Sequence, residues 1–396
     1  MDTLIELYDE RAIENVLAPD LFRPRRVIYL CPEAVTQDRP LQESLRRFFR
    51  ERGVDAEIEF VECSLYRADR IAAQLRRLTE RFPDCAIDIT GGTDAALFAA
   101  GMLSATSSTP VFTYSHKRGR FYDISHASFA DDLPCGLAYR VDEFFAMAGG
   151  TMRQGRVDSG LLGRYLDRFD AFFQIYLAHR REWVSAITYL QRASQHPSES
   201  EPLYVDCAYE LKGERGSRVQ ADPELLRSLA SIGYLRDLEI DEGERVRFSF
   251  RDSLIRGWLR DVGSVLELYM YKACLDAGCF QDVVCSAIVD WDGAHGHDLV
   301  SNEIDVAAAR GIVPLFISCK TCEIRTEALN ELAILHDRFG GSKAAKACIV
   351  TSEPCGAAAR HRAAQLGITV IDLEELQAGL AADRLQVIMK VREQLG

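Results

Sequence analysis

Apolar strand segments alternate with helical segments through the first 150 residues of this 396-residue chain. Short apolar runs predict strands at residues 4–8, 26–31, 56–63, 85–89 and 110–114. The segments between them predict helices, at residues 41–52, 68–82 and 94–104. Strands that alternate with helices form a parallel sheet covered on both faces, so we expect a Rossmann-like, doubly wound α/β unit. Such sheets bind ligands at the carboxyl ends of their strands.

A glycine-rich turn follows the buried strand at residues 85–89. Its residues Thr90, Gly91, Gly92 and Thr93 lead directly into the next predicted helix. Paired glycines let backbone N–H groups approach an anion, and the helix N-terminus adds its dipole. The turn does not match G-x-G-x-x-G, which favours a phosphate-bearing ligand other than a dinucleotide. A turn that needs glycine for steric reasons alone is the alternative.

Two acidic residues, Glu303 and Asp305, alternate with apolar residues on a predicted strand near the C-terminus. Side chains two apart on a strand share a face, so both carboxylates are expected on one face and Ile304 and Val306 on the other. The chain is then expected to turn and to return as a buried strand that ends in Lys320.

This arrangement has the groups that metal-dependent phosphodiester hydrolysis needs. Carboxylates bind hard divalent cations such as Mg²⁺ or Mn²⁺. The bound cation acidifies its water, and Lys320 would orient that water or neutralise the phosphate. The turn is expected within residues 307–313 and the returning strand at 314–318. The alternative is that Glu303 and Asp305 only decorate a solvated strand edge.

Further candidates lie close to this motif. Asp290 and Asp292 end the preceding predicted strand, and Asp290 is a candidate metal ligand. Glu267 lies beside the apolar stripe of a predicted helix, where an exposed structural role is equally ordinary. His295 and His297 are interpreted as loop surface, because a metal-bound water needs no histidine base.

Composition indicates a globular protein without a membrane span. The chain is 47% hydrophobic and contains no apolar run of about 18 residues. Its N-terminus lacks the basic region of a signal peptide, so we expect a cytoplasmic protein. The net charge of −13 argues against a general nucleic-acid coat protein but not against a nuclease with a local basic groove. Cys319-x-x-Cys322 has no second pair and is a weak zinc signal.

The length and the pattern of segments predict three domains. A sensor-like domain would span residues 1–150, a connector residues 151–255 and a catalytic domain residues 256–396. Within the connector, a helix, an acidic turn and a strand-like segment at residues 223–250 suggest a winged-helix fragment.

The C-terminal motif resembles the PD-(D/E)XK nuclease family, whose fold is an α/β domain like that of restriction endonucleases. One departure is plain: the final triplet should read acid-x-Lys, and here it reads Ser318-Cys319-Lys320. Serine is a poor magnesium ligand. The resemblance therefore implies that Glu303 supplies the displaced charge and that Glu267 occupies the place of the helix acid that the family often has.

The whole chain is similar to the CRISPR-ancillary nucleases that carry an N-terminal CRISPR-associated Rossmann-fold (CARF) sensor. The similarity rests on the opening segment at residues 7–15, the Thr-Gly-Gly-Thr turn, the winged-helix-like middle and the C-terminal motif, in that order. It implies a homodimer that binds a cyclic oligoadenylate, most simply cyclic tetra-adenylate, made by a type III CRISPR complex. Binding would activate metal-dependent cutting of RNA, DNA or both.

The same similarity implies a set of ligand-binding residues. They are Thr90, Gly91, Gly92 and Thr93 on the phosphate, with Asp9, Glu10 and Asn15 nearby. Many relatives carry lysine after the Gly-Gly-Thr triplet, whereas this chain has Asp94. Compensating charge would come from His116, Lys117 or Arg118, unless these form only a solvated hairpin turn.

Two other functions stay open on the sequence alone. Because Ser318 replaces the acid, the C-terminal domain could be inactive and the protein a nucleotide-sensing regulator. Alternatively, the N-terminal domain binds an ordinary nucleotide and the protein acts in restriction or repair.

Overall fold

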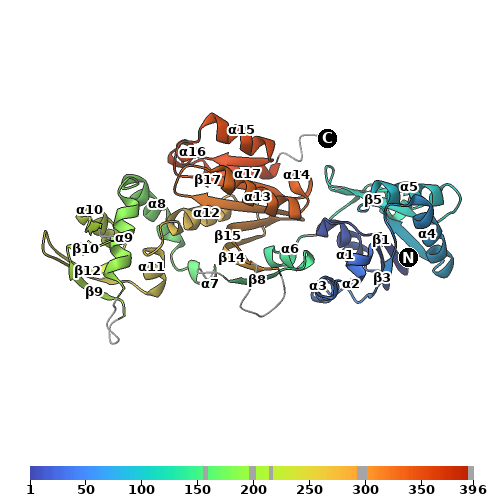
Figure 1. Cartoon of the computed structure of the whole chain (residues 1–396), viewed down its shortest axis with the longest axis horizontal. Helices are drawn as coiled ribbons and strands as arrows, with labels where there is room; N and C mark the ends of the chain where they lie inside the picture. The colour runs from blue at the N-terminus through green and yellow to red at the C-terminus, as the bar shows by residue number, and fades with distance from the viewer. Residues whose placement is uncertain (155–158, 196–201, 214–216, 292–300, 391–396) are drawn as a thin grey trace.

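The structure is a computed structural model that describes residues 1–154, 159–195, 202–213, 217–291 and 301–390. Its parts lie in a row (Figure 1): a seven-stranded N-terminal sheet at one end, a six-stranded C-terminal sheet in the middle, and a helical connector with a three-stranded sheet at the other end. The predicted α/β class, with a Rossmann-like N-terminal sheet, is confirmed. None of the helices in the described residues has the length and apolarity that crossing a bilayer requires.

The N-terminal sheet has the strand order β3-β2-β1-β4-β5-β6-β7. The strands are β1 Thr3–Leu7, β2 Arg26–Cys31, β3 Glu57–Glu62, β4 Cys85–Asp88, β5 Val111–Ser115, β6 Arg120–Ser125 and β7 Leu133–Pro134. The first five pair in parallel, whereas β6 and β7 are antiparallel. Strands β1 and β2 are buried almost throughout because both faces of the sheet are covered.

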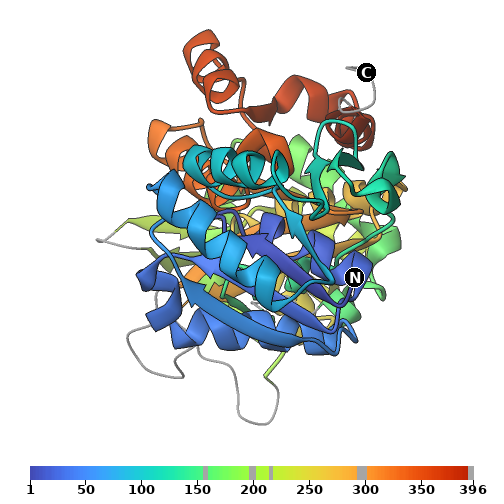
Figure 2. The same cartoon turned by 90° about the vertical axis from the view of Figure 1, so that its right-hand side faces the viewer.

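Helices cover the two faces of this sheet. They are α1 Leu17–Phe22, α2 Glu33–Gln37, α3 Arg39–Glu51, α4 Ala68–Arg81 and α5 Asp94–Ser104. Residues of α1 and α3 pack in one apolar cluster, and those of α4 and α5 in a second. In Figure 2 this end faces the viewer, with α4 and α5 (light blue and cyan) in front of the strands.

Helix α6 (Val141–Met147) connects the two large sheets. Its Phe145 is fully buried and packs against Trp291, Phe316 and Phe339 of the C-terminal part. The next strand, β8 (Thr151–Gln154), pairs with β14 of the C-terminal sheet. The first residues that the sequence assigns to the connector therefore belong to that sheet, a long-range pairing that local patterns do not encode.

The connector contains helices and a small antiparallel sheet. Its elements are α7 Ser159–Leu162, α8 Phe169–Ala178, α9 Trp183–Ala193, β9 Tyr204–Ala208, β10 Glu210–Lys212, β11 Arg218–Gln220, α10 Pro223–Ser231, β12 Leu235–Asp241, β13 Arg245–Phe250 and α11 Ser253–Trp258. Helix α10 begins at Pro223 after the cap residue Asp222, and the β12–β13 hairpin follows it. This is the helix-and-hairpin order that the sequence indicates for a winged-helix fragment.

The C-terminal sheet has the order β18-β17-β16-β15-β14-β8. Its elements are α12 Ser264–Asp276, β14 Asp282–Asp290, β15 Ser301–Arg310, β16 Val313–Lys320, α13 Thr326–Arg338, α14 Gly341–Ala344, β17 Lys346–Thr351, α15 Ala357–Gln365, β18 Ile368–Ile371, α16 Leu373–Gln377 and α17 Ala381–Lys390. Strands β14, β15 and β16 are antiparallel, and β16, β17 and β18 are parallel. The chain reverses at Gly311, which has a φ of +57° and lies within the predicted span 307–313. The turn itself is shorter than that span, because β15 continues to Arg310.

Candidate functional site

Strands β15 and β16 separate at the C-terminal motif and form a fork. Their paired register runs from Arg310 and Val313 to Val306 and Ile317 and ends there. Beyond this point the carboxylate of Asp305 occupies the gap, and its Oδ2 accepts the backbone N–H of Cys319 at 2.6 Å. A side chain thus takes the place of a strand partner for a backbone donor that would otherwise be unpaired.

The regular alternation of side chains breaks at the fork. Ile304 packs with Ala287 in the cluster that includes α6, whereas Val306 packs in the cluster that includes α12. The prediction that Ile304 and Val306 share a face is therefore wrong. The physical reason lies in β14, where Ser286, opposite Asp305, has a φ of +52° and interrupts the ladder.

Lys320 points toward Asp305, as the motif predicts. Its Nζ lies 3.9 Å from Asp305 Oδ2, with 34% of the lysine side chain and 18% of the aspartate side chain exposed. Burial raises the pKa of the Asp305 carboxyl, while Lys320 and the Cys319 N–H act to lower it. The nearby Glu303 carboxylate raises this pKa further, which places the two acids within electrostatic reach of each other.

Glu303 and Glu267 lie beside this pair. Glu303 is exposed, and its Oε1 accepts a hydrogen bond from Ser286 Oγ at 3.2 Å. Glu267 is half-buried in the first turn of α12. Burial raises the pKa of the Cys319 thiol well above its usual range, and the charges of Asp305 and Glu267 raise it further, so both carboxylates lie within electrostatic reach of this thiol.

Asp290 is not brought to the fork. Its carboxylate pairs with Arg153 of β8, with Arg153 Nε 2.7 Å from Oδ2 and Nη2 3.0 Å from Oδ1. It lies four residues along β14 from Ser286, about 13 Å at the rise of an extended strand. Its predicted role as a metal ligand therefore has no support from its position. Asp292, His295 and His297 lie outside the described residues.

The fork offers a partial ligand set for a divalent cation. Among the residues that the structure describes, no three His, Cys, Asp or Glu side chains are grouped closely enough to hold an ion by themselves. Magnesium, however, is usually held by one or two carboxylates and keeps several waters. Asp305 and Glu303 fit that requirement. Ser318 adds only a hydroxyl, whose Oγ lies 3.4 Å from Asp305 Oδ2.

The connector holds the end of the fork in a way that the sequence did not reveal. The backbone N–H of Ser352, just after β17, donates to Lys320 O at 3.1 Å. Tyr176 of α8 is hydrogen-bonded to the Ser352 hydroxyl, and Arg180 Nη1 donates to Ser352 O at 3.2 Å. Arg180 also pairs with Glu353. The contacts of Tyr176 and Arg180 span more than 170 residues, so no local signal could have indicated them.

A second candidate site lies at the carboxyl ends of β1 to β4, where the Rossmann-like sheet predicts a ligand. We call this cavity of about 640 Å³ the sensor cavity. Its walls include Asp9, Glu10, Arg11, Gly92 and Thr93. Four of these five residues, all but Arg11, are among the predicted ligand-binding set, and their role in ligand binding stays a prediction.

Arg11 is a charged lining residue that is absent from the predicted ligand-binding set. Its guanidinium holds the Asp9 carboxylate through two bonds of 2.9 and 3.0 Å, and this pairing lowers the pKa of Asp9 against the effect of burial. Asp9 Oδ2 also accepts the N–H of Gly92 at 3.0 Å. One glycine amide predicted to meet a phosphate is therefore occupied by Asp9, and Arg11 supplies the positive charge at this cavity.

Other predicted ligand residues serve the turn itself. Thr90 donates its hydroxyl to Asp88 and accepts the N–H of Tyr114 at 2.8 Å. Thr93 caps α5, because its Oγ1 accepts the Ala96 N–H at 3.3 Å. Asp94 is thus the first residue of the helix and not its cap.

Asn15 and Gly91 also build the loop and do not line the cavity. Asn15 is 2% exposed, and its side chain accepts the N–H of Asp9 and donates to the carbonyl of Asp9. A Cβ at Gly91 would lie 2.8 Å from Asp9 Cβ, so only glycine lets the two loops pack.

Three buried carboxyl groups lie beneath the turn. Glu6, Glu14 and Asp88 are each about 1% exposed. Burial raises the pKa of Asp88 to about 7, with Glu14 adding to the rise. Burial also raises the pKa of Glu6 well above its usual range, and the charges of Asp88 and Glu14 raise it further.

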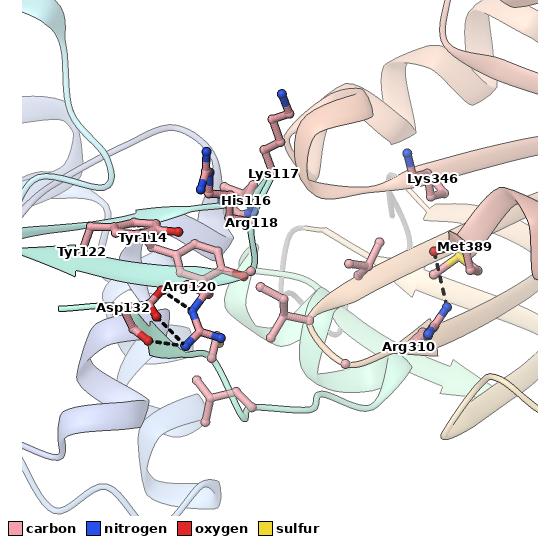
Figure 3. Close-up of a pocket in the computed structure, with 16 residues that line it drawn as sticks. Tyr114, His116, Lys117, Arg118, Arg120, Tyr122, Asp132, Arg310, Lys346 and Met389 are labelled. Carbon is pink, nitrogen blue, oxygen red and sulfur yellow. Dashed lines mark hydrogen bonds and ion pairs between the residues drawn. The ribbon is translucent and has the colours of Figure 1, made fainter. Parts of the chain in front are cut away.

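His116 and Lys117 lie at a different cavity from the one predicted for them. This cavity of about 670 Å³, which we call the hairpin cavity, lies between the β5–β6 hairpin and the β15–β16 turn (Figure 3). His116 Nε2 lies 2.9 Å from Glu14 Oε2, and Arg11 Nη1 lies 3.1 Å from Glu14 Oε1. Glu14 therefore links the two cavities through its contacts with Arg11 and His116.

No known family model and no curated protein sequence matches this chain. Two solved structures share its fold over nearly the whole length. Protein VC1899 from Vibrio cholerae is 18% identical with a TM-score of 0.75, covering 98% of both chains. Can2 from Sulfobacillus thermosulfidooxidans, solved in complex with cyclic tetra-adenylate, is 18% identical with a TM-score of 0.70, covering 98% of this chain and 99% of Can2. At such identities the comparison establishes the common fold.

Proposed function

We propose that this protein is a metal-dependent endonuclease that a cyclic oligoadenylate, in the first place cyclic tetra-adenylate, activates. The observation that carries the nuclease half is the fork, in which the Asp305 carboxylate and the Lys320 ammonium lie 3.9 Å apart with Glu303 beside them. The sensor half is supported by the cavity at the carboxyl ends of β1 to β4 and by the fold shared with cyclic tetra-adenylate-bound Can2. The biological setting would be type III CRISPR defence.

In this proposal the fork residues have separate roles. Asp305 and Glu303 would hold Mg²⁺ or Mn²⁺, with Glu267 close enough to add negative charge. The ion, when bound, would supply an acidified water. Lys320 would stabilise the charge that develops on the phosphate, since its ammonium already lies at the rim of the fork.

The sensor cavity would bind the activator through Arg11, Thr93 and the exposed ring of Tyr66. Tyr66 is 83% exposed and lines the same cavity, so its ring is available for stacking on an adenine base. Two copies of the chain would present two such cavities to one cyclic ligand, which is why we also propose a homodimer.

A cleavage matrix tests this function. Labelled RNA and DNA, single- and double-stranded, would be incubated with Mg²⁺ or Mn²⁺, with and without cyclic tetra-adenylate. We expect cutting only with activator and metal, and a loss of about 10²-fold or more in Lys320→Ala and Asp305→Asn. Glu331→Gln, at an exposed position of α13, is the control and should cut normally. Cutting by both fork variants at the wild-type rate would refute the site.

One observation favours a second function, that of a nucleotide-sensing regulator without catalysis. Asp305 Oδ2 already has the Cys319 N–H, the Ser318 hydroxyl and Lys320 around it, and no acid stands at position 318. The Ser318→Asp variant separates the two functions. A nuclease should need several-fold less metal when this acid is restored, whereas a regulator should bind cyclic tetra-adenylate and cut nothing in either form.

A further inference from the structure

The hairpin cavity concentrates positive charge in an otherwise acidic chain. Its lining includes five Lys and Arg side chains and one carboxylate, that of Asp132; the cations are Lys117, Arg118, Arg120, Arg310 and Lys346. Arg120 holds Asp132, with Nε 2.6 Å from Oδ1. The whole chain has a formal charge of −13, so the charge of this cavity is opposite in sign to that of the chain as a whole. Lysine and arginine side chains around a cavity match phosphate oxygens.

The cations come from two walls that are far apart in the sequence. Lys117 and Arg118 are exposed at the tip of the β5–β6 hairpin, whereas Lys346 begins β17 and Arg310 ends β15 (Figure 3). Positive charge thus continues from inside the cavity onto the hairpin surface. A ligand with several phosphates along a chain uses such a track better than a compact anion does.

The cavity also offers an aromatic wall. Tyr122 of β6 lines it, half-buried and on the same side as the hairpin cations. Cations that follow a backbone, combined with aromatic rings on which bases stack, are the usual means of binding single-stranded nucleic acid without reading its sequence.

The position of the cavity separates it from the fork. It lies at the Val313 end of β16, and Lys320 is at the other end, about 23 Å away at the rise of an extended strand. We propose that the hairpin cavity binds the phosphate backbone of a single-stranded nucleic acid at a site distinct from the Asp305–Lys320 fork. This inference rests on the proposed function for its choice of ligand, but not on cutting.

Binding without divalent ions tests the proposal. The full-length protein in EDTA would be titrated against a labelled oligouridylate of about twelve nucleotides, with fluorescence anisotropy at several salt concentrations. The double variant Lys117→Glu with Arg118→Glu should bind about tenfold or more weakly, and its slope of log K against log salt should fall by about 1.4. Lys346→Glu, on the opposite wall, should lower the slope by about 0.7.

A matched control has the same charge change elsewhere. Arg76→Glu with Arg77→Glu alters two adjacent exposed arginines of α4 and should bind the strand within twofold of wild type. Affinities of the cavity variants equal to those of this control would overturn the proposal. So would loss of cyclic tetra-adenylate binding with strand binding intact, which would assign the cavity to the activator. If the wild-type protein cuts no nucleic acid while the cavity variants bind the oligouridylate more weakly than wild type, the nuclease proposal fails and the binding proposal stands.

Discussion

At the scale of single residues, the buried Asp88 carboxyl group beneath the glycine turn makes the free energy of unfolding depend on pH. Its carboxylate accepts the Thr90 N–H at 2.8 Å, yet burial raises its pKa to about 7. An unfolded aspartate titrates near 3.9, so between about pH 4 and 7 the folded protein holds a proton that the unfolded chain has released. The free energy of unfolding should therefore fall as the pH rises through this window and level off above it, as far as this group is concerned.

Asp88→Asn should make that pH dependence shallower. The amide keeps an acceptor for the Thr90 N–H but cannot ionise, so about 1.4 kcal/mol per pH unit should disappear from the slope. Glu6, whose pKa is also raised, would retain its own contribution. Urea unfolding between pH 5 and 8 measures the effect, and Asp55→Asn at an exposed position is the control. Equal slopes for Asp88→Asn and wild type would contradict the assignment.

At the scale of elements, the start of α5 depends on one left-handed residue. Gly92 has a φ of +95°, and a Cβ there would lie 2.8 Å from Leu7 Cβ. We expect Gly92→Ala to destabilise the protein by about 2 kcal/mol or more and to weaken cyclic tetra-adenylate binding, because a side chain is strained at this φ and meets β1.

Gly101 in the same helix gives the opposite expectation. It has an ordinary helical conformation, and a Cβ there would meet nothing within 4 Å. Gly101→Ala should therefore stabilise the protein by up to about 1 kcal/mol. Thermal unfolding of the two variants should move in opposite directions; a loss of similar size in both would show that the turn has no special conformational need.

The elements of this chain could be predicted closely because periodicity is local. Strand β2 lies where its apolar run predicts it, and helix α5 begins where the glycine-rich turn before it ends. The fork could not be predicted fully, because alternation assumes a regular ladder and Ser286 interrupts it. The pairing of Asp290 with Arg153 joins residues far apart in the chain, which one sequence does not reveal. Arg11 lies only two residues from Asp9, but the Gly92 N–H that shares the Asp9 carboxylate comes from a distant segment.

At the scale of the whole molecule, the sensor cavity and the fork belong to different sheets of one packed structure. The N-terminal sheet meets the C-terminal sheet at the end where Gly311 turns, whereas the fork faces the connector through Tyr176 and Arg180. One apolar cluster includes residues of both sheets, from Leu4 to Val370. Activation of the fork from the sensor cavity would therefore have to pass through this shared core or between two copies of the chain.

Phe145 of α6 is the residue by which this shared core can be tested. Its ring lies 5.5 Å from that of Phe339 and 6.0 Å from that of Phe316. Phe145→Ala should cost about 3–5 kcal/mol and should speed hydrogen exchange in β17 as well as in α6. Ile71→Ala is the contrast, because Ile71 is equally buried but belongs to a cluster confined to residues 5–111. Unchanged exchange in β17 for Phe145→Ala would show that the two sheets are energetically independent, and coupling would then have to run between protomers.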